Sequence, residues 1–453
     1  MRVIVAEAVR LPTGGLTPDG VEALRARFTH ENPAYWEARR NRRPCRLIPR
    51  RLHTYADAPD EVLLPRGAWP EVRQSLPADV PLEVDDQTVL PPRGALALAG
   101  ELRPYQAAAV EAVAAAGSGV IVAPTGSGKT VVAMALMARI PTPALFLVHT
   151  NVLLQQTVRR VREFLGVEPG VLGAGRQEIG DITVATVQAL QRRGTDDLAG
   201  RFGLVLLDEA HHCPACSFRA VLAAFRARYR VGLTATPERK DRLHPILFDV
   251  VGPVVHAIGR PALEQQASIL RPTLLAVETD FRFFYRRNWA SLITSLTRNQ
   301  ARNQLVVETV AATLGSRSLV TTERIEHAEQ LAERLTARLS VGVACVHGRL
   351  SRDVVAAHLA DLAAGRVSVV VATTSLVGEG FDLPDLDTLY VTVPHGSPAK
   401  AAQLVGRILR PSPGKAAPRV IDFADVRVPV LRSQWTKRKK VYEGEPPHSA
   451  PHD

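Results

Sequence analysis

The stretch Ala123-Pro-Thr-Gly-Ser-Gly-Lys-Thr130 constrains the fold of this chain more than any other segment. The apolar residues 120–122 precede it and are typical of a buried strand, whereas residues 131–139 have the pattern of a helix that ends before Pro141. A strand, a glycine-containing loop and a helix in this order form a phosphate cradle at the start of the helix. We therefore expect an α/β domain with a phosphate site at this loop.

The loop predicts a nucleoside triphosphate as the ligand. Gly126 and Gly128 allow backbone N–H groups to crowd around a phosphate chain. Lys129 is placed to reach the outer phosphates, and the Thr130 hydroxyl to complete a Mg²⁺ shell. Ala123 stands where the motif usually has its first glycine, so a plain glycine turn is the alternative. The predicted phosphate-binding residues are Thr125, Gly126, Ser127, Gly128, Lys129 and Thr130.

A second signal lies downstream, where four apolar residues, 204–207, are followed by Asp208 and Glu209. The apolar run predicts a buried strand that delivers both carboxylates to its carboxyl end. Phosphoryl transfer to water needs one carboxylate to hold Mg²⁺ and another group to orient the attacking water. Asp208 fits the first role and Glu209 the second, so the pair together with Lys129 predicts ATP hydrolysis.

Strand, loop and helix patterns repeat from about residue 100 onward, in two series. The apolar runs of the first are 120–122, 144–148, 182–185, 204–207 and 231–233, and those of the second are 319–321, 341–346, 367–371, 389–393 and 420–421. Apolar strands that alternate with helices predict parallel sheets covered on both faces. The second series lacks a phosphate loop, so we expect a sister domain without its own nucleotide. Residues 260–272 are the expected connection.

Residues 1–95 precede this pattern and are expected to form a small α+β accessory domain. Thr17-Pro-Asp19 and Asn32-Pro33 each combine a capping residue with a proline, so each predicts the start of a helix. Residues 51–55 and 61–64 flank a turn and are expected to pair as a hairpin. Residues 91–94, with two prolines and a glycine, indicate a linker.

A basic cluster lies between the second helix and the hairpin. Its members, preceded by Tyr35 and Trp36, are Arg39, Arg40, Arg42, Arg43, Arg46, Arg50 and Arg51. Arginines beside aromatic residues can grip a nucleic-acid backbone and stack on bases, which makes residues 1–95 a possible DNA-binding domain. The alternative is a solvated basic face next to two core aromatic residues.

Composition limits the class of protein. The 453 residues carry a formal net charge of +11, which suits a polyanionic partner. No stretch of about 18 apolar residues is present, so no transmembrane helix is expected. Four cysteines in a chain of this length do not suggest a disulfide framework, which fits a reducing cytoplasm.

Several further features have two interpretations. Cys213 and Cys216, next to two histidines, can be drawn as a zinc site, but a single such pair favours cysteines of a loop or helix start. Residues 281–287 mix aromatics with arginines and either touch nucleic acid or pack at a strand edge. Residues 432–440 are either a basic helix that contacts phosphates or a solvated helix end. Residues 441–453 are expected to be a disordered tail.

With these motifs in hand, the chain resembles the superfamily 2 helicases and translocases over residues 101–425. The motifs that carry the resemblance occur in the family's order. They are Leu102-Arg-Pro-Tyr-Gln106, Ala123 to Thr130, residues 147–155, residues 184–186, Asp208-Glu-Ala-His211, Gly232-Leu-Thr-Ala-Thr-Pro237, Gly378-Glu-Gly-Phe-Asp382 and Gln403-Leu-Val-Gly-Arg-Ile-Leu-Arg410. The family's phosphate motif commonly begins with alanine, so Ala123 is consistent with the family although the general motif has glycine there.

The resemblance implies two tandem RecA-like parallel-sheet domains, with ATP and Mg²⁺ as cofactors. The implied boundaries are 96–262 for the ATP-binding domain and 263–440 for the C-terminal helicase domain. Arg407 and Arg410 are implied as arginine fingers that join Lys129, Asp208 and Glu209 in catalysis. Further implied nucleotide contacts are Arg103, Gln106, Gly380, Asp382 and Gln403. Implied nucleic-acid contacts are Thr150, Gln155, Thr186 and Thr373, and implied coupling residues are His211, Thr234 and Thr236.

The details of the motifs are similar to those of the XPB/UvsW-type group and of restriction-enzyme motors, which act on DNA. Arg302-Asn303 also resembles the start of the second domain in these motors. We therefore expect a monomeric, cytoplasmic DNA helicase or translocase, associated with the nucleoid when bound to single-stranded or forked DNA. Two alternatives remain: an RNA helicase, and a DNA-stimulated ATPase switch in a larger complex that separates no strands.

Overall fold

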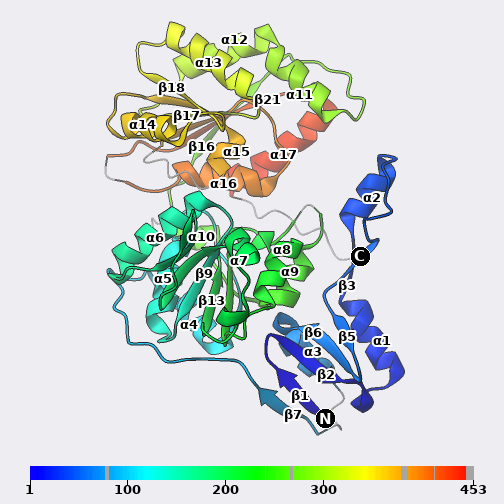
Figure 1. The fold of residues 1–453 in the computed structure, drawn as a ribbon. Coiled ribbons are helices and arrows are strands. Elements are labelled where there is room, and N and C mark those ends of the chain that lie inside the picture. Colours follow the sequence, from blue (N-terminus) through cyan, green and yellow to red (C-terminus); the bar gives the residue numbers. More distant parts are fainter. Residues whose placement is uncertain (77–80, 240, 266–268, 379–385, 413, 445–453) are drawn as a thin grey trace. The chain divides into compact units, whose positions relative to one another are not determined.

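The structure, a computed structural model, describes residues 1–76, 81–239, 241–265, 269–378, 386–412 and 414–444 (Figure 1). Its contacts divide the chain into two compact units. The first unit comprises Met1–Ala123 and Gly128–Ile258, and the second comprises Pro124–Ser127 and the chain from Gly259 onward. Every helix in the described ranges is too short or too polar to span a lipid bilayer.

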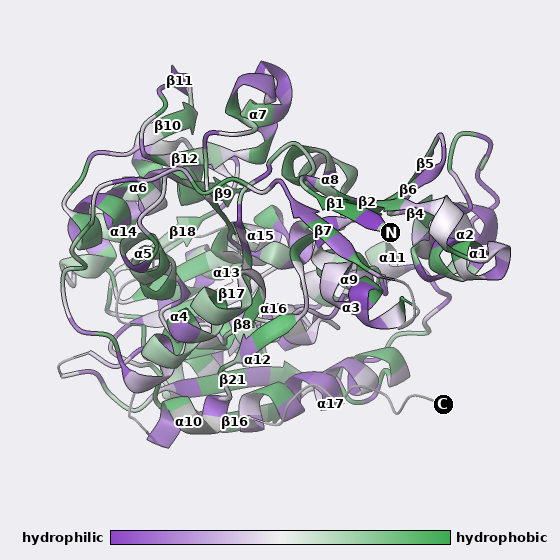
Figure 2. Ribbon diagram, turned by 90° about the horizontal axis from the view of Figure 1, so that it is seen from below, coloured by the Kyte–Doolittle hydropathy of each residue, from purple (hydrophilic) through white to green (hydrophobic). Residues whose placement is uncertain are grey.

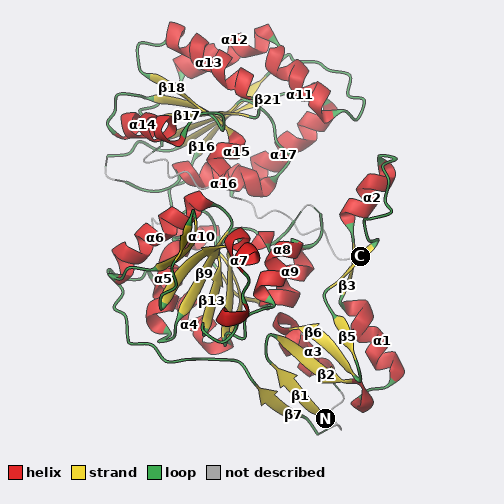
Figure 3. Cartoon of the chain, viewed as in Figure 1, coloured by secondary structure: helices red, strands yellow, loops and turns green. Residues whose placement is uncertain are grey.

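The accessory region of the first unit is built on a five-stranded sheet (Figure 3). In spatial order its strands are β5 (Ala56–Ala58), β6 (Glu61–Pro65), β2 (Ala8–Pro12), β1 (Arg2–Val5) and β7 (Glu83–Asp86). Its helices are α1 (Pro18–Arg27), α2 (Pro33–Arg40) and α3 (Trp69–Ser75). A separate two-stranded sheet joins β3 (Thr29–Glu31) to β4 (Arg51–His53). Apolar residues from β1, β2 and β6 form one core with Phe28.

Local chemistry explains where the first two helices begin. The Thr17 side chain accepts a hydrogen bond from the Gly20 amide, and the Asn32 side chain accepts one from the Ala34 amide. Each cap is followed by proline at the first helical position, which needs no amide donor there. Both predicted helix starts are confirmed.

The expected hairpin is wrong in its pairing. Residues 51–53 form β4 and pair with β3, whereas β6 pairs with the short β5 across a tight turn. Asp60 occupies this turn with a φ of 58°, a conformation that favours a short connection directly before β6. Residues 51–53 are thereby left for β3, which lies on the other side of α2.

The second sheet of the first unit has eight strands. In spatial order they are β11 (Arg176–Gln177), β10 (Gly170–Gly173), β12 (Ile182–Thr186), β9 (Ala144–Val148), β13 (Leu204–Leu207), β14 (Tyr229–Thr234), β8 (Ser118–Val122) and β15 (Val254–Ala257). All neighbours pair in parallel except β10 and β11. The helices are α4 (Pro104–Ala116), α5 (Lys129–Arg139), α6 (Asn151–Leu165), α7 (Val187–Arg193), α8 (Cys216–Leu222) and α9 (His244–Val251).

Burial explains why this sheet is parallel. Every residue of β9, β12 and β13 is buried, so neither face of these strands meets solvent, and their sequences are largely hydrophobic (Figure 2). Such strands need helices on both faces, and helical crossovers between parallel strands supply them. The resulting order sets β14 between β8 and β13, which places three loops at one edge of the sheet.

The second unit contains a six-stranded, fully parallel sheet. Its strands, in spatial order, are β16 (Thr273–Glu278), β21 (Arg419–Ala424), β20 (Thr388–Val391), β17 (Ser318–Thr322), β19 (Val369–Thr373) and β18 (Val343–Val346). Its helices are α10 (Arg260–Gln265), α11 (Trp289–Arg298), α12 (Gln300–Ala312), α13 (Ile325–Arg338), α14 (Arg352–Ala363), α15 (Thr374–Gly378), α16 (Pro398–Ile408) and α17 (Pro429–Glu443). The two parallel sheets confirm the expected α/β architecture of tandem RecA-like domains.

Two predictions about the second unit need correction. The expected tail over 441–453 begins too early, because α17 continues to Glu443 and the Tyr442 hydroxyl donates to buried Asp422 at 2.8 Å. The possible phosphate contacts of residues 432–440 do not include Arg438. Its guanidinium is buried and forms two 2.7 Å bonds with Asp422. Residues 445–453 lie outside the described part of the chain.

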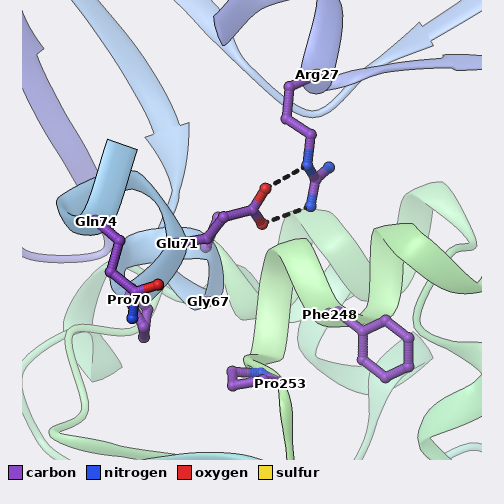
Figure 4. Close-up of a pocket in the computed structure, with 8 residues that line it drawn as sticks. Arg27, Gly67, Pro70, Glu71, Gln74, Phe248 and Pro253 are labelled. Carbon is purple, nitrogen blue, oxygen red and sulfur yellow. Dashed lines mark hydrogen bonds and ion pairs between the residues drawn. The ribbon is translucent and has the colours of Figure 1, made fainter. Parts of the chain in front are cut away.

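A cavity of about 250 Å³ lies where the accessory region meets α9 (Figure 4). Arg27 and Glu71 form an ion pair on its wall, with a closest distance of 2.7 Å. Gly67 approaches the backbone after α9 so closely that a Cβ there would lie 2.4 Å from the Gly252 amide nitrogen. This close backbone approach shows that the accessory region packs directly on the second sheet's helices.

Candidate functional site

The phosphate loop joins β8 to α5 through a backbone that needs glycine at two positions. Gly126 has a φ of 92°, and Gly128, the residue before α5, has a φ of 81°. A Cβ at Gly128 would also lie 2.4 Å from the Gln106 amide nitrogen. The Lys129 ammonium donates to the Ala123 carbonyl at 3.1 Å, which holds it beside the loop. The loop therefore has the shape of a cradle that any larger side chain would fill.

Gln106 and Arg103 stand at the start of α4, next to this loop. Gln106 is buried, and its Oε1 accepts a hydrogen bond from the Arg103 amide at 3.0 Å. Its carbonyl oxygen therefore helps to fix the first turn of α4, while its amide nitrogen faces Gly128. The implied nucleotide contacts of Gln106 and of the exposed Arg103 stay predictions.

Asp208 and Glu209 follow β13, as the sequence predicts. The Asp208 amide donates to the Leu147 carbonyl at 3.0 Å, and its Oδ1 accepts from the Glu209 amide at 2.9 Å. Glu209 has a φ of 48° and a ψ of 51°, a left-handed conformation that is uncommon for a non-glycine residue. Strain of this kind clusters at functional sites, where the surrounding structure holds it.

The two carboxyl groups have opposite pKa shifts. Burial and the neighbouring Glu209 carboxylate raise the pKa of Asp208 to about 6. Burial opposes ionisation of Glu209 as well, but the neighbouring His211 ring and the charge of Lys129 outweigh it and lower the Glu209 pKa to about 2. Glu209 is therefore ionised at neutral pH. The ionised form of Asp208 is the one that a nearby cation would stabilise most.

The predicted coupling residues lie in one chain of contacts. His211 Nδ1 lies 3.3 Å from the Glu209 carboxylate and 3.3 Å from the Thr234 hydroxyl. The Thr234 hydroxyl donates to the Thr236 carbonyl at 3.0 Å. Since β14 lies between β8 and β13, this chain connects Glu209 to the loop that follows β14.

Sequence reasoning missed Arg239. Its Nη1 donates to the His211 carbonyl, and its guanidinium pairs with Asp241, with Nη2 at 2.5 Å from Oδ2. Arg239 thus connects the loop after β14 to the acidic motif. No local pattern marks this contact, because Arg239 meets His211 only where the ends of the adjacent strands β13 and β14 come together.

The donor set of the site fits ATP and Mg²⁺. The loop offers the cradle around Gly128 and the ammonium of Lys129 to phosphate oxygens. Asp208 and the Thr130 hydroxyl supply hard oxygen donors, which Mg²⁺ prefers. Thr125 and Ser127 belong to the same loop. Their individual contacts with nucleotide stay predictions.

The predicted nucleic-acid contacts of the first unit lie at the carboxyl ends of neighbouring strands. Thr150 caps α6 by accepting from the Leu153 amide, and Thr186 caps α7 by accepting from the Ala189 amide. Thr186 is buried, whereas Gln155 is exposed on α6. Both hydroxyls cap helices. A nucleic-acid strand that crossed them would therefore meet the helix N-termini and their amides. Contact with nucleic acid stays a prediction.

The predicted residues of the second unit lie on β19 and around α16. Thr373 is buried at the end of β19. Gln403 and Arg407 lie in α16, where Arg407 Nη2 donates to the Val377 carbonyl at 3.0 Å, and Arg410 follows the helix. Gly380 and Asp382 lie outside the described residues. The arginine-finger role of Arg407 and Arg410 stays a prediction.

Two other sequence features, the cysteine pair and Arg302-Asn303, are also located by the structure. Cys213 is buried, which raises the pKa of its thiol to about 12, and Cys216 is exposed at the start of α8. No cluster of three or more potential metal ligands occurs in the described ranges. Arg302 and Asn303 are buried in α12, where Arg302 forms bonds of 2.7 and 2.9 Å with Asp425. Their contacts are structural.

Two family models match the chain in succession. The model described as "Type III restriction enzyme, res subunit" matches residues 99–239, and "Helicase conserved C-terminal domain" matches residues 301–412. The first match contains the phosphate loop, the acidic motif and Thr236. The second contains Thr373 and α16.

Curated relatives agree with these models. A DNA 3'-5' translocase XPB2 of Sulfurisphaera tokodaii is 38% identical over 167 residues, 37% of each chain. A DNA 3'-5' helicase XPB of Kineococcus radiotolerans is 30% identical over 326 residues, 68% of this chain and 57% of the relative. The chain thus spans less than two thirds of the length of these relatives.

Solved structures support the fold. A fragment of a putative HsdR subunit of a type I restriction enzyme from Vibrio vulnificus has a TM-score of 0.58 at 20% identity, over 77% of this chain and 68% of that one. The Type ISP restriction-modification enzyme LlaBIII bound to DNA has a TM-score of 0.53 at 18% identity, over 71% of this chain and 28% of that one. At these identities the likeness concerns the fold alone.

Proposed function

The chain belongs to helicase superfamily 2, in the group that includes XPB and the restriction-enzyme motors, and on this premise we propose that it is an ATP-driven DNA helicase or translocase. The observation that carries the proposal is the continuous set of contacts from Glu209 through His211 to Thr234 and Thr236. Such a connection gives the state of the nucleotide site a physical route to the loop after β14. A plain phosphate-binding protein has no need for it.

The residues of the first unit divide the work of hydrolysis between them. Lys129 and the amides of the phosphate loop bind and neutralise the phosphates, and Asp208 with Thr130 would hold Mg²⁺, which supplies charge neutralisation on the transferring phosphoryl group. Glu209, kept ionised by His211 and Lys129, orients the attacking water. Its left-handed backbone holds the carboxylate at the end of β13.

The second unit supplies the remaining charge. We assign Arg407 and Arg410 as arginine fingers that stabilise the transition state, with Gln403, Gly380 and Asp382 as nucleotide contacts. An arginine from a second domain stabilises developing charge only when the nucleotide cleft is closed. Hydrolysis then alternates closed and open states, which steps two strand-binding domains along DNA.

DNA is the proposed substrate because both curated relatives described above are named as DNA enzymes. Single-stranded or forked DNA would cross Thr150, Gln155, Thr186 and Thr373 through its backbone, with no readout of base sequence. We further propose residues 96–262 and 263–440 as the two motor domains of a monomer, with residues 1–95 as an accessory DNA-binding domain.

Two DNA assays test the proposal in parallel. A triplex-displacement assay reports translocation along duplex DNA, and a forked-duplex assay reports strand separation. Activity in either assay that requires ATP hydrolysis supports a motor, and activity in the first alone identifies a translocase. ATP hydrolysis with neither activity would support an ATPase switch instead, and activity on RNA forks alone would support an RNA helicase.

A further inference from the structure

The segment from β3 to β4, residues 29–53, projects from the accessory sheet and is here named the arginine arm (Figure 1). Seven of the 13 residues from 39 to 51 are arginines. All seven side chains are exposed, and the arm's acidic residues are only Glu31 and Glu37. The arm therefore concentrates an excess of five positive charges, against +11 for the whole chain.

Most of this charge has no acidic partner. Arg51 pairs with Glu31 at 3.5 Å and the charge of Arg50 also acts on Glu31, whereas the other five arginines of the arm form no ion pair within the described parts of the chain. Exposed, unpaired guanidinium groups present planar donor forks that match phosphate oxygens. A solvated basic face would normally intersperse acidic residues, and this one does not.

The arm is held in one shape by its own backbone. The Asn32 amide donates to the Arg50 carbonyl at 3.0 Å, and the Asn32 side chain donates to the Pro49 carbonyl at 2.7 Å. The Arg43 amide donates to the Ala38 carbonyl at 2.8 Å. These bonds close the ends of the loop, so the arginines lose little freedom when they bind a ligand.

The surroundings of Trp36 decide which nucleic-acid form fits. Arg39 and Arg50 lie 5.8 and 5.2 Å from its ring centroid, and its indole nitrogen donates to Glu31 at 2.7 Å. The indole is thus occupied by the arm itself and does not serve as a platform for an unstacked base, as single-strand binding would need. The exposed guanidinium groups then have phosphates as the groups they can bind, and a duplex presents phosphates on two strands.

The base of the arm is fixed to the motor domain. Directly at its two ends, His30 Nε2 lies 2.8 Å from the Asp249 carboxylate and the Thr54 hydroxyl donates to it at 3.1 Å. Asp249 lies in α9, whose residues Ile246, Leu247, Val250 and Val251 belong to the core of the second sheet. Leu52 of β4 packs against the same core. A ligand gripped by the arm is therefore held by the ATP-binding domain.

We propose that the arginine arm binds the phosphate backbone of duplex DNA beside the motor. The proposal rests on the proposed function, because only a DNA motor gains from a duplex grip fixed to its ATP-binding domain. Neutralising phosphates releases condensed counterions, so the grip must weaken steeply as salt rises. Each arginine that contacts one phosphate contributes about 0.9 to the slope of log affinity against log salt.

The test measures binding of a fluorescent 30-base-pair duplex by the full chain across a salt series. The triple variant Arg42→Ser, Arg43→Ser, Arg46→Ser is expected to weaken binding at least tenfold and to reduce the salt slope by about three. Arg42→Lys, Arg43→Lys, Arg46→Lys keeps the charge and is expected to retain the slope. A slope unchanged in the serine variant would overturn the proposal.

Two controls separate charge in the arm from other effects. Leu47→Ser alters the arm, where Leu47 is 95% exposed, without removing charge, and is expected to keep the slope. The triple variant Arg334→Ser, Arg338→Ser, Arg366→Ser removes the same charge from the second unit. It is also expected to keep the salt slope of the wild type. An equal loss in this second control would mean a general charge effect and overturn the assignment to the arm.

Single-stranded DNA and ATPase rates complete the design. A loss confined to single-stranded DNA would contradict the choice of duplex. Stimulation of wild-type ATPase by DNA, measured at saturating DNA, reports the proposed function independently of the arm. If DNA stimulates the wild-type ATPase normally and the serine variant binds duplex DNA normally, the proposed role of the arm is refuted but the motor is not. If no DNA stimulates the wild type, the proposed motor function is refuted.

Discussion

His30 and Asp249 are 219 residues apart in the sequence, yet His30 Nε2 lies 2.8 Å from the Asp249 carboxylate. Arg27 and Thr54 also donate to this carboxylate, each at 3.1 Å, and the Asp249 side chain has no exposed surface. A single buried acid therefore fixes both ends of the arginine arm to α9. A buried acid with three donors is expensive to disturb, because the donors lose their partner at once.

Asp249→Ala should consequently lower the stability of the first unit by about 3 kcal/mol, since it removes the buried acceptor that His30, Arg27 and Thr54 share. Calorimetry should show a lower unfolding temperature for the first unit only. Glu71→Gln is the matched control. Among the described residues Glu71 pairs with Arg27, its side chain is 54% exposed, and its loss should cost less than about 1 kcal/mol. Equal effects of the two variants would refute the anchor.

Arg438 and Asp422 form the corresponding buried pair of the second unit, with side chains 1% and 0% exposed. Arg438→Met should destabilise that unit by about 3–5 kcal/mol, because it leaves the Asp422 carboxylate buried without its cation. The double variant with Asp422→Leu should recover most of the loss. Unfolding temperatures of both variants, with exposed Lys437→Ala as a control, check this. A double variant no more stable than Arg438→Met would contradict it.

His327 should make the second unit sensitive to acid. It is buried between Thr322 and Asn303, with ring nitrogens 2.7 and 3.0 Å from their side-chain oxygens, and burial lowers its pKa to about 3. Between about pH 6.5 and pH 3 the folded unit therefore binds fewer protons than the unfolded chain. Its free energy of unfolding decreases as the pH is lowered through that window.

The expected contribution of His327 between pH 7 and pH 5 is about 2 kcal/mol of lost stability. His327→Gln replaces the titrating ring with an amide and should remove this part of the pH dependence, although it lowers stability at pH 7. Urea unfolding of both proteins at pH 7 and pH 5 measures the difference. The same pH dependence in His327→Gln would show that other groups cause it.

His211 and Thr234 should act as one unit in coupling. His211→Ala removes the ring that connects Glu209 to Thr234. The stimulation of ATPase by DNA should therefore fall more than the ATPase rate without DNA. Thr234→Val should have a similar effect, and the double variant should be little worse than either. A double-mutant cycle on the stimulation factor should give a coupling free energy of about 1 kcal/mol. Full additivity would mean that the 3.3 Å contact has no functional role.

Local sequence signals predicted the site best where one backbone segment decides the geometry. The left-handed Gly128, the carboxylates after β13 and the caps of α1 and α2 each depend on a few consecutive residues. The adjacency of β8, β14 and β13 follows from the general rules of parallel sheets. The contact between His211 and Thr234 then follows from two adjacent strand ends.

Long-range partners were not predictable in the same way. Arg438 lies in a basic run that is typical of an exposed helix, and only the tertiary structure places Asp422 beside it. Asp249 lies in an apolar segment with no motif, so its three partners from the accessory region left no sequence signal. The hairpin expected between residues 51–55 and 61–64 was wrong because β5 lies beside β6, and only the tertiary structure brings residues 51–53 to β3.

The ATPase rate with and without forked DNA, measured for the wild type, Glu209→Gln and Glu111→Gln, tests whether DNA drives ATP hydrolysis at this site. Glu111, exposed on α4 and paired with Arg139, is a matched control outside the site. We expect strong stimulation by DNA in the wild type and the control, and a rate at least 100-fold lower in Glu209→Gln, consistent with loss of a catalytic carboxylate (about 10²–10⁴-fold). A normal rate in Glu209→Gln, or a wild type that no DNA stimulates, would contradict this expectation.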